Sequence, residues 1–512
     1  MNFAHVSQFP ILRGGRVRDP SFDYGHTQNC NVVWFNGRHH VYWKGLEALP
    51  ETTNPPRLGL GYIDPDGFDE TAGVTRTPFD GRTLKLEATN PIVDFTSAAR
   101  FPSGTAAPLD VYTNGGLTAG GRIGDIAAVV HGGKVKLYCN VYNYNNAGTN
   151  RLALIESTDG KTFSFVQEIT YSGGGFGRTM GPVWDVGGTL WALFGQAHAT
   201  RGFYKVLMSS ADGLTWALHG TAIPLSNDPA SFNYYGMPVG RAFVHGAHAI
   251  AVVPGSRISA DWPEGIGLWR KPLASLGDGL PWEEYPRNPV ALRDPTKGGL
   301  WQANLFFAGP DLWALCNTWG MVGFENIDSA TLNTMRGAPY YDQDVTGFKH
   351  VAAMRATNRF ALDDWAYDPI GDGGLWQLRH GDLYLASGQS APAAGGAVTV
   401  IADRADARTL WRIDRQSGFY LLRPAAAPAL AVQPDGGAHN RARGMNLVLG
   451  ATDPTDAVNN IPFHWHLPLT AGSEPLCAAL VNRHSSLALP PTIAQDVALG
   501  SARDQWRLLP VI

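Results

Sequence analysis

The sequence lacks the features that mark membrane-spanning and nucleic-acid-binding proteins. Its 40 basic and 44 acidic residues nearly balance, giving a formal net charge of -4, and no long run of one sign occurs. This balance offers no electrostatic basis for a nucleic-acid or anionic-membrane partner. No apolar stretch approaches the ~18 residues that cross a bilayer, and the N-terminus has no signal-peptide pattern. We therefore expect a soluble protein; its compartment is left open, and extracellular action is compatible with the sequence.

Cysteine is scarce as well, with four residues that lie far apart and form no C-x-x-C pair. This spacing argues against a disulfide framework. Three of the four lie in or beside apolar strand-like runs, so buried free thiols are expected. The four are Cys30, Cys139, Cys316 and Cys477. His245 and His248 lie close together but show no third ligand, and no metal site is predicted.

The chain is long and rich in residues that favour strands and turns. Its 512 residues exceed one compact core, so two domains are expected. The 60 glycines and 35 prolines are spread without a period, which suits many short strands joined by turns. The aromatic residues (16 Trp, 17 Tyr and 22 Phe) favour pleated surfaces and are also the side chains that stack on sugar rings.

One phrase occurs five times: a polar or special residue, an apolar strand, a glycine-containing turn and a second apolar strand. The copies begin at Asn29, Asp125, Met180, Pro238 and Gln302. The last three intervals are each about 60 residues, and the first implies an insertion of roughly 35 residues within 70–119. Such radial repetition predicts a propeller, whose last blade needs a closing strand. Segments 4–12 and 350–362 are the candidates for that strand.

A second repeat supports the blades. Ser157–Phe163 and Ser210–Trp216 are near-copies of an S-x-D-G-x-T-F/W turn, and Asp66-Gly67 and Asp278-Gly279 are weaker copies. Asp caps such a turn through its side chain, and Gly adopts its positive φ. These hairpins are predicted to join outer strands, so they indicate fold and not chemistry.

The two repeats together resemble the five-bladed propellers of glycoside hydrolase family 43 and its relatives, families 32, 62, 68, 117 and 130. The resemblance covers about Arg18 to Ala366. It implies that the first residue of each innermost strand faces a central funnel where a glycosidic bond is cleaved. It leaves room for a structural calcium in the propeller centre and implies no other cofactor.

From Gly374 the texture changes to three repeats, each ending in a tryptophan: Trp411, Trp465 and Trp506. This pattern resembles the ricin-type β-trefoil, which is common as a carbohydrate-binding module. The predicted fold class is therefore all-β, a five-bladed β-propeller followed by a β-trefoil. The predicted domains are 1–370 for the propeller and 371–512 for the trefoil.

The predicted trefoil departs from the sugar-binding pattern that the resemblance implies. The glutamine of the Q-x-W phrase is replaced by Thr409, Phe463 and Asp504, and Ala431 and Ala488 replace the sugar-binding aspartate in two repeats. The third repeat, with Asn482, His484 and Asp504, is the best remaining candidate for sugar binding. The alternative is a trefoil kept for packing or for contact with a partner.

The resemblance also implies three carboxylates, one at the start of each of the first three innermost strands. The repeat aligns these positions with Asn29, Asp125 and Met180, and only Asp125 matches. An amide cannot act as a general base near neutral pH, and a thioether cannot donate a proton.

Three interpretations remain. In the first and favoured one, the chain is a glycoside hydrolase of poly- or oligosaccharides with relocated acids, and Asp125, Asp19 and Glu325 form the catalytic set. Asp19 belongs to an Asp-Pro-Ser phrase like that of the family, although both Asp19 and Glu325 also suit turns or solvated loops. In the second, the funnel is a non-catalytic glycan binder; the third is a structural or interaction module. The predicted substrate-binding residues are His26, Gln28, Asn29, Trp301 and Gln302, and the oligomeric state is left open.

Overall fold

The fold is taken from a computed structural model. It describes residues 3–5, 11–13, 26–46, 57–63, 84–94, 121–143, 151–171, 179–236, 240–257, 265–292, 299–308, 311–319, 349–356, 362–416, 419–435, 446–452, 463–467, 477–478, 480–482 and 506–511. The described residues are almost entirely strands and turns, which confirms the predicted all-β class. No helix among them has the length and hydropathy needed to cross a bilayer.

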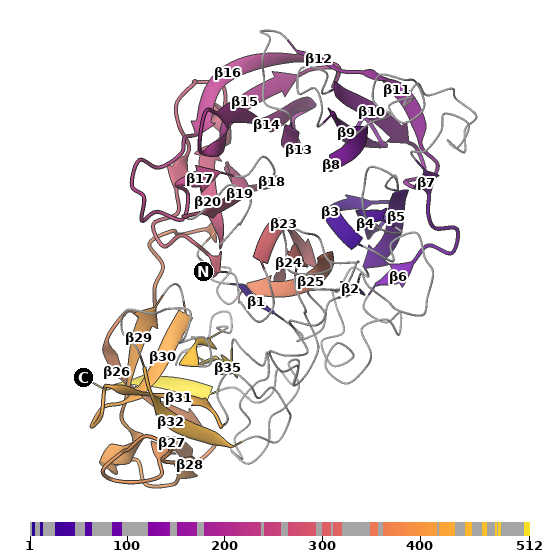
Figure 1. The fold of residues 1–512 in the computed structure, drawn as a ribbon. Coiled ribbons are helices and arrows are strands. Elements are labelled where there is room, and N and C mark those ends of the chain that lie inside the picture. The colour runs from indigo at the N-terminus through magenta and orange to yellow at the C-terminus, as the bar shows by residue number, and fades with distance from the viewer. Residues whose placement is uncertain are drawn as a thin grey trace.

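Five blades of antiparallel strands surround one axis, which confirms the predicted propeller (Figure 1). The innermost strands are β3 (His26–Phe35), β8 (Gly121–His131), β13 (Thr179–Val186), β18 (Arg241–His245) and β23 (Gly299–Ala308). The second strands are β4 (Arg38–Leu46), β9 (Lys134–Asn143), β14 (Thr189–His198), β19 (His248–Ser256) and β24 (Asp311–Trp319). The third strands are β5 (Arg57–Ile63), β10 (Arg151–Ser157), β15 (Gly202–Ser210), β20 (Gly265–Pro272) and β25 (Lys349–Ala356).

Further strands complete the outer edges. They are β6 (Lys85–Leu86) and β7 (Val93–Asp94) in blade 1, β11 (Ser164–Glu168) in blade 2, β16 (Thr215–Ile223) in blade 3, and β21 (Glu283–Glu284) and β22 (Ala291–Leu292) in blade 4. Two further strands, β12 (Thr170–Tyr171) and β17 (Tyr235–Gly236), connect neighbouring blades; β12 pairs with β16, and β17 pairs with both β15 and β19. The expected insertion in blade 1 falls largely outside the described residues.

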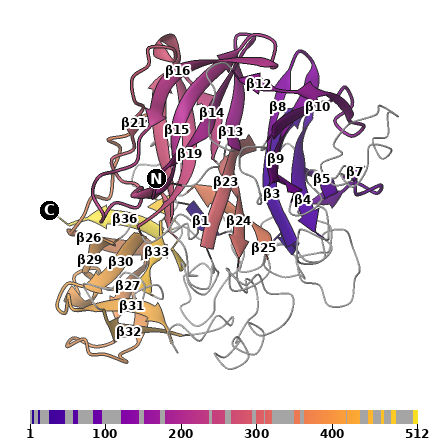
Figure 2. The same cartoon turned by 45° about the horizontal axis from the view of Figure 1, so that its top comes forward.

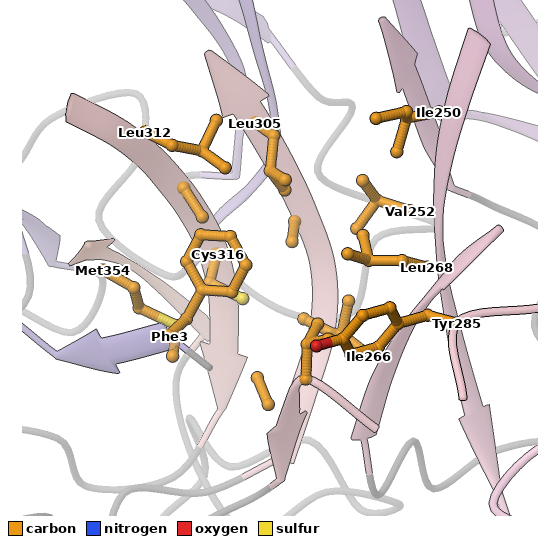
Figure 3. Packing of buried hydrophobic residues seen from close by; sticks show 14 of the residues in the cluster. Phe3, Ile250, Val252, Ile266, Leu268, Tyr285, Leu305, Leu312, Cys316 and Met354 are labelled. Atoms are coloured by element: carbon orange, nitrogen blue, oxygen red, sulfur yellow. The ribbon is translucent and has the colours of Figure 1, made fainter. Parts of the chain in front are cut away.

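Both ends of the predicted propeller supply the closing strands of blade 5. Strands β1 (Phe3–His5) and β2 (Leu12–Arg13) pair with β25, and β25 pairs with β24. Figure 3 shows Phe3 packed beside Met354 and Cys316, with side chains of blade 4 opposite. Both candidate segments therefore contribute, so the N-terminal residues are part of the blade 5 core.

The three Asp-Gly turns of this repeat within the described residues, at 159–160, 212–213 and 278–279, have the positive φ at glycine that the sequence predicts, and Asp66-Gly67 lies outside those residues. In the blade 3 turn, Gly213 has φ of +77° and its N–H donates to Ser210 Oγ at 2.8 Å, while Asp212 Oδ1 accepts from the N–H of Leu214 at 2.7 Å. A Cβ on Gly213 would lie 2.6 Å from Tyr138 Oη, so the position also has no room for a side chain. The Tyr138 hydroxyl donates to the Gly213 carbonyl at 3.1 Å, which ties blade 2 to blade 3.

Buried asparagines join the blades near the axis. Asn31 of blade 1 donates to the carbonyl of Ile126 at 3.1 Å and accepts from the N–H of Ala128 at 3.1 Å. Asn304 of blade 5 bonds in the same two-way manner to Cys30 O and Val32 N of blade 1. Asn140 of blade 2 bonds to both backbone groups of Met180 in blade 3. An amide side chain supplies both a donor and an acceptor, so each one satisfies two backbone groups that strand pairing leaves open.

The C-terminal region forms a second β structure. Its larger sheet contains β26 (Gly374–His380), β27 (Leu383–Ser387), β28 (Val398–Ile401), β29 (Trp411–Gln416), β30 (Phe419–Pro424), β33 (Trp465–His466), β34 (Cys477–Ala478), β35 (Val481–Asn482) and β36 (Trp506–Pro510). Strands β31 (Leu430–Pro434) and β32 (Leu447–Ala451) form a separate pair. The three repeat tryptophans meet in one apolar core. Trp411 Nε1 donates to Leu385 O at 2.8 Å, and Trp465 Nε1 donates to Val432 O at 3.0 Å, so two repeats use the same contact.

An ionic cluster joins this region to blade 4, beside which it lies in both views (Figures 1 and 2). Asp368 pairs with Arg415 of β29 and lies 4.0 Å from Arg287, which follows β21. Arg287 also donates to the carbonyls of Trp365 and Tyr367. Trp365 packs in the propeller core, whereas Ile370 packs in the C-terminal core. Residues 365–370 therefore connect the two cores, with one end packed in the propeller and the other in the C-terminal region.

Candidate functional site

Four of the five innermost strands carry the same kind of irregularity, in which three steps along the inner strand match two steps along the second strand. The register of strand pairing shifts between Gln28 and Asn31, between Ile123 and Ile126, between Met180 and Val183, and between Leu300 and Ala303. A bulge of this kind turns a side chain out of the regular alternation and towards a new direction. In blade 1 the bulge includes Asn29 at φ of +56°, a left-handed conformation that asparagine tolerates better than most residues.

These shifts correct the alignment that the repeat spacing predicted. Counted from the paired residues on either side of each bulge, Asp125 and Gln302 are equivalent to Cys30 and Pro182, and not to Asn29 and Met180. The four bulges are of one kind, so they do not cause the offset. It arises because the inner strands run different distances from the bulge to the hairpin turn: the last paired residues, Phe35, His131, Val186 and Ala308, lie 5, 6, 4 and 6 residues after Cys30, Asp125, Pro182 and Gln302. In blade 4 the strand begins at Arg241, and the predicted start, Pro238, lies outside the described residues.

The axis is occupied by a chain of three polar side chains from three blades. Gln302 Nε2 donates to Asp125 Oδ1 at 2.8 Å, and Gln302 Oε1 accepts from Arg241 Nη2 at 3.4 Å. Asn317 of β24 donates to the same Oε1 at 3.2 Å. Asp125 is 7% exposed and Gln302 is 1% exposed, so the carboxylate is fixed and almost sealed from bulk water. The structure therefore brings together Asp125, a predicted catalytic residue, and Gln302, a predicted substrate-binding residue.

A second buried cation lies near Asp125. Lys205 of β15 is 1% exposed, and burial lowers its pKa to about 7, although the negative charge of Asp125 acts in the opposite direction. Gln28, Asn29 and Lys44 of blade 1 are also buried polar side chains, and Gln28 and Lys44 are directly opposite each other in the pairing of β3 with β4. The blade 1 residues therefore extend the polar lining from the axis into the first blade.

The thiols near this site are not reactive groups. Burial raises the pKa of Cys30 to about 12, with Arg241 opposing the shift, and raises that of Cys139 to about 12. Cys30, Cys139 and Cys316 are all buried and free, as the sequence predicts. A thiolate nucleophile at the axis is thereby excluded near neutral pH.

The oxygen atoms around the axis do not fit the calcium that the resemblance leaves open. Calcium binds six to eight oxygen ligands that are typically rich in carboxylate. Here the axial carbonyls of Cys30 and Ile126 both accept from Arg241 Nη2, at 3.3 and 3.2 Å. The guanidinium of Arg241 thus already bonds to both of these carbonyl oxygens. No group of three or more His, Cys, Asp or Glu side chains suited to a metal occurs among the residues with described positions.

The other predicted site residues are only partly placed. Asp19, Glu325, His484 and Asp504 lie outside the described residues, as do the side chains of His26 and Trp301. Asn482 is 2% exposed in β35, where it pairs with Trp465, so it is part of the packed sheet.

In the second repeat of the C-terminal region, Ala431 stands where the sugar-binding pattern has an aspartate, and this position is filled by packing. Ala431 is completely buried and packs with Phe463 and Leu421. In the first repeat, Thr409 is buried and its hydroxyl bonds to Gln377 and to the carbonyl of Asp406. Two of the three repeats therefore use these positions for packing.

Sequence reasoning did not single out Arg241, Asn317 or Lys205. Each is a polar residue inside an otherwise apolar strand, at Gly240-Arg241-Ala242, Cys316-Asn317 and Tyr204-Lys205-Val206. A buried strand that retains such a residue needs a partner for it, and this was the signal available. Gly240 prepares the position of Arg241, because a Cβ there would lie 2.8 Å from the carbonyl oxygen of Val252.

No family model matches the chain. No curated protein matches it either. Among solved structures, an exo-β-1,3-galactanase from Clostridium thermocellum is 11% identical, with 95% of this chain and 96% of that chain covered and a TM-score of 0.40. A Bombyx mori family 32 β-fructofuranosidase is 10% identical, with 98% and 90% covered and a TM-score of 0.42. A family 117 glycoside hydrolase from the marine bacterium Zobellia galactanivorans is 12% identical, with 69% and 90% covered and a TM-score of 0.41.

These matched structures are glycoside hydrolases, the class that the propeller resembles in its sequence. The resemblance of the C-terminal region to a ricin-type β-trefoil stays a prediction.

Proposed function

We propose that the protein is a glycoside hydrolase that cleaves a poly- or oligosaccharide at the propeller axis, with Asp125 as its fixed carboxylate. The observation that carries the proposal is the axial position of this buried carboxylate, which lies in a bulge of β8 and accepts from Gln302 at 2.8 Å. This carboxylate is buried and is oriented by an amide. It lies where innermost strands of different blades meet, which is typical of a functional group more than of a packing residue.

Hydrolysis of a glycosidic bond needs a second carboxyl group. The two groups lie about 6.5–9.5 Å apart when configuration is inverted and about 5–5.5 Å apart when it is retained. Among the described residues at the axis Asp125 is the one carboxylate, because the equivalent positions hold Cys30, Pro182 and Gln302. We propose that Asp19 or Glu325 supplies the second group.

The same chemistry favours a second candidate function, a glycan-binding funnel without hydrolysis. Neither Cys30 nor Pro182 can transfer a proton at neutral pH, since burial raises the pKa of Cys30 to about 12. In this function, Asp125, Gln302 and the buried polar residues of blade 1 would bond to sugar hydroxyls.

We further propose that residues 1–370 and 371–512 are separate domains and that the second is a β-trefoil. The support is that Trp365 and Ile370 pack in different cores and that two repeats share the contact from a tryptophan Nε1 to a carbonyl. With two of its repeats filled, the third repeat is the proposed sugar site of that domain. His484 and Asp504 are its proposed sugar-binding residues, because Asn482 is 2% exposed and belongs to the packed sheet.

The test compares single substitutions in reducing-sugar release on a broad polysaccharide panel. Asp125→Asn should lower activity about 10²–10⁴-fold, the usual contribution of a general acid or base, and Asp19→Asn and Glu325→Gln should show which residue is its partner. Asp363→Asn is the matched control, because that carboxylate is 71% exposed. Unchanged activity in Asp125→Asn would remove Asp125 from the mechanism. Binding on a glycan array without release by the wild type would select the second candidate.

A further inference from the structure

The guanidinium of Arg241 is the most highly connected group at the propeller axis. Its Nη1 donates to the carbonyl of Gly240 at 2.7 Å, and its Nη2 donates to Cys30 O at 3.3 Å, to Ile126 O at 3.2 Å and to Gln302 Oε1 at 3.4 Å. These four oxygens belong to blades 4, 1, 2 and 5. The residue is 6% exposed, so one side chain links four blades from inside.

The oxygen atoms around this guanidinium resemble the ligands of a structural cation. None of its four acceptors is a carboxylate, and three are main-chain carbonyls, the type of oxygen that also ligates hard metal ions. Two of these carbonyls are shared: Cys30 O also accepts from Asn304 Nδ2 at 3.0 Å, and Ile126 O accepts from Asn31 Nδ2 at 3.1 Å. Both lone pairs of each oxygen are therefore used, and neither is left for a metal ion.

The charge at the axis is balanced through an amide. Gln302 accepts from Arg241 and donates to Asp125, so the positive and negative groups are joined by one side chain that bonds to both. Burial lowers the pKa of Arg241 to about 10, which still leaves the guanidinium protonated at neutral pH. A fixed positive charge is thus present at the centre without an added ion.

We infer that Arg241 takes the place of the divalent cation at the centre of this propeller, so that the five blades close around a guanidinium and need no axial calcium. This inference concerns closure of the fold and does not rest on hydrolysis at Asp125. It rests on the hydrogen bonds from Arg241 to the four oxygens, which are then not open to a metal ion.

The first measurement uses the full-length wild-type protein. Its thermal midpoint, Tm, is compared after exhaustive dialysis against a chelator and after addition of calcium chloride. We expect no shift in Tm and no calcium retained after dialysis. A fall in Tm on chelation that calcium restores in the wild type, but not in Asp125→Asn, would overturn the inference.

The second measurement removes the guanidinium. Arg241→Ala removes one of the two donors of Cys30 O and of Ile126 O, together with the donor to Gly240 O, and should lower Tm by roughly 5–10 °C, as the loss of a buried charged group does. About 20 mM guanidinium chloride, far below denaturing concentrations, should recover part of that loss by refilling the site, whereas sodium chloride should not. Arg379→Ala, which removes an arginine paired with the exposed Asp382, is the matched control for both salts.

Two results of the second measurement would also overturn the inference. One is an Arg241→Ala protein as stable as the wild type. The other is a destabilised protein that sodium chloride rescues as well as guanidinium does. If Arg241→Ala yields no folded protein, Arg241→Lys replaces it; its single ammonium cannot span the four oxygens, so a Tm equal to that of the wild type would count against the inference.

Discussion

The propeller and the C-terminal region both repeat one unit around a centre, but they fill that centre differently. The propeller places Asp125, Gln302 and Arg241 at its axis, whereas the C-terminal region places the tryptophans of its repeats in one apolar core. Burial of polar groups is unfavourable unless each one is hydrogen-bonded, and the asparagines between the blades supply many of those bonds. A centre that keeps polar groups despite this cost is the better candidate for chemistry, and an apolar centre serves stability.

The largest test of this difference is removal of a tryptophan from the C-terminal core. Trp411 is fully buried and donates to Leu385 O at 2.8 Å. Trp411→Ala should lower the free energy of unfolding by about 3–5 kcal/mol, through lost burial and the cavity left behind. Chemical denaturation followed by tryptophan fluorescence and circular dichroism measures it. Trp34→Ala in blade 1, where the ring is 51% exposed, should cost less than about 1 kcal/mol; equal effects from the two substitutions would contradict the assignment of roles.

The next test uses pH to reveal the polar centre of the propeller. Burial lowers the pKa of Lys205 to about 7 in the folded protein from 10.5, with Asp125 opposing the shift. Between these values the unfolded chain binds more protons than the folded one, so the free energy of unfolding should rise with pH. The rise should be about 3 kcal/mol from pH 7 to pH 9.5.

Lys205→Met should remove this rise and make the protein more stable than the wild type at pH 7. Denaturation at several pH values checks both effects. Lys134→Met is the control. The Lys134 side chain is 41% exposed and pairs with Glu156, so its removal should leave the dependence of the unfolding free energy on pH unchanged. If the unfolding free energy of Lys205→Met still rises with pH, groups other than Lys205 cause the rise.

The smallest expected effect concerns the joint between the two regions. Asp368 contacts Arg415 on one side and Arg287 on the other. Asp368→Ala should cost roughly 1–3 kcal/mol, because it leaves two half-buried guanidinium groups without their shared carboxylate. In calorimetry the two regions should then unfold in transitions that lie further apart.

The control for the joint is Asp382→Ala. Asp382 also pairs with an arginine, Arg379, but the side chain of Asp382 is 97% exposed. It should leave the transitions where they are in the wild type. If both substitutions behave alike, Asp368 does not couple the regions.

The repeats in the sequence were sufficient to predict the fold class. Five copies of one strand phrase and the Asp-Gly turns specified the blades, because hydrophobic periodicity and turn chemistry are local properties. The sequence offered segments 4–12 and 350–362 as alternatives for one closing strand, whereas the structure uses strands from both. The exact alignment of the strands was not predicted, because the number of residues from the bulge to the hairpin turn differs between blades and the alternation of side chains does not locate the bulge.

The axial site was predicted in part. Asp125 and Gln302 were selected from their positions at strand starts and do meet. Arg241, Lys205 and Asn317 were missed because a polar residue in an apolar strand has no identifiable partner until the blades assemble.

The sequence by itself determined the kind of element and its repetition: strands, tight glycine turns, and two sets of repeats with different endings. Only the tertiary structure decided which side chains meet at the axis, because residues 125, 241 and 302 are brought together by closure of the ring and not by any local preference. The physical reason is that a side chain's neighbours across blades depend on how all five blades close, which no single segment encodes.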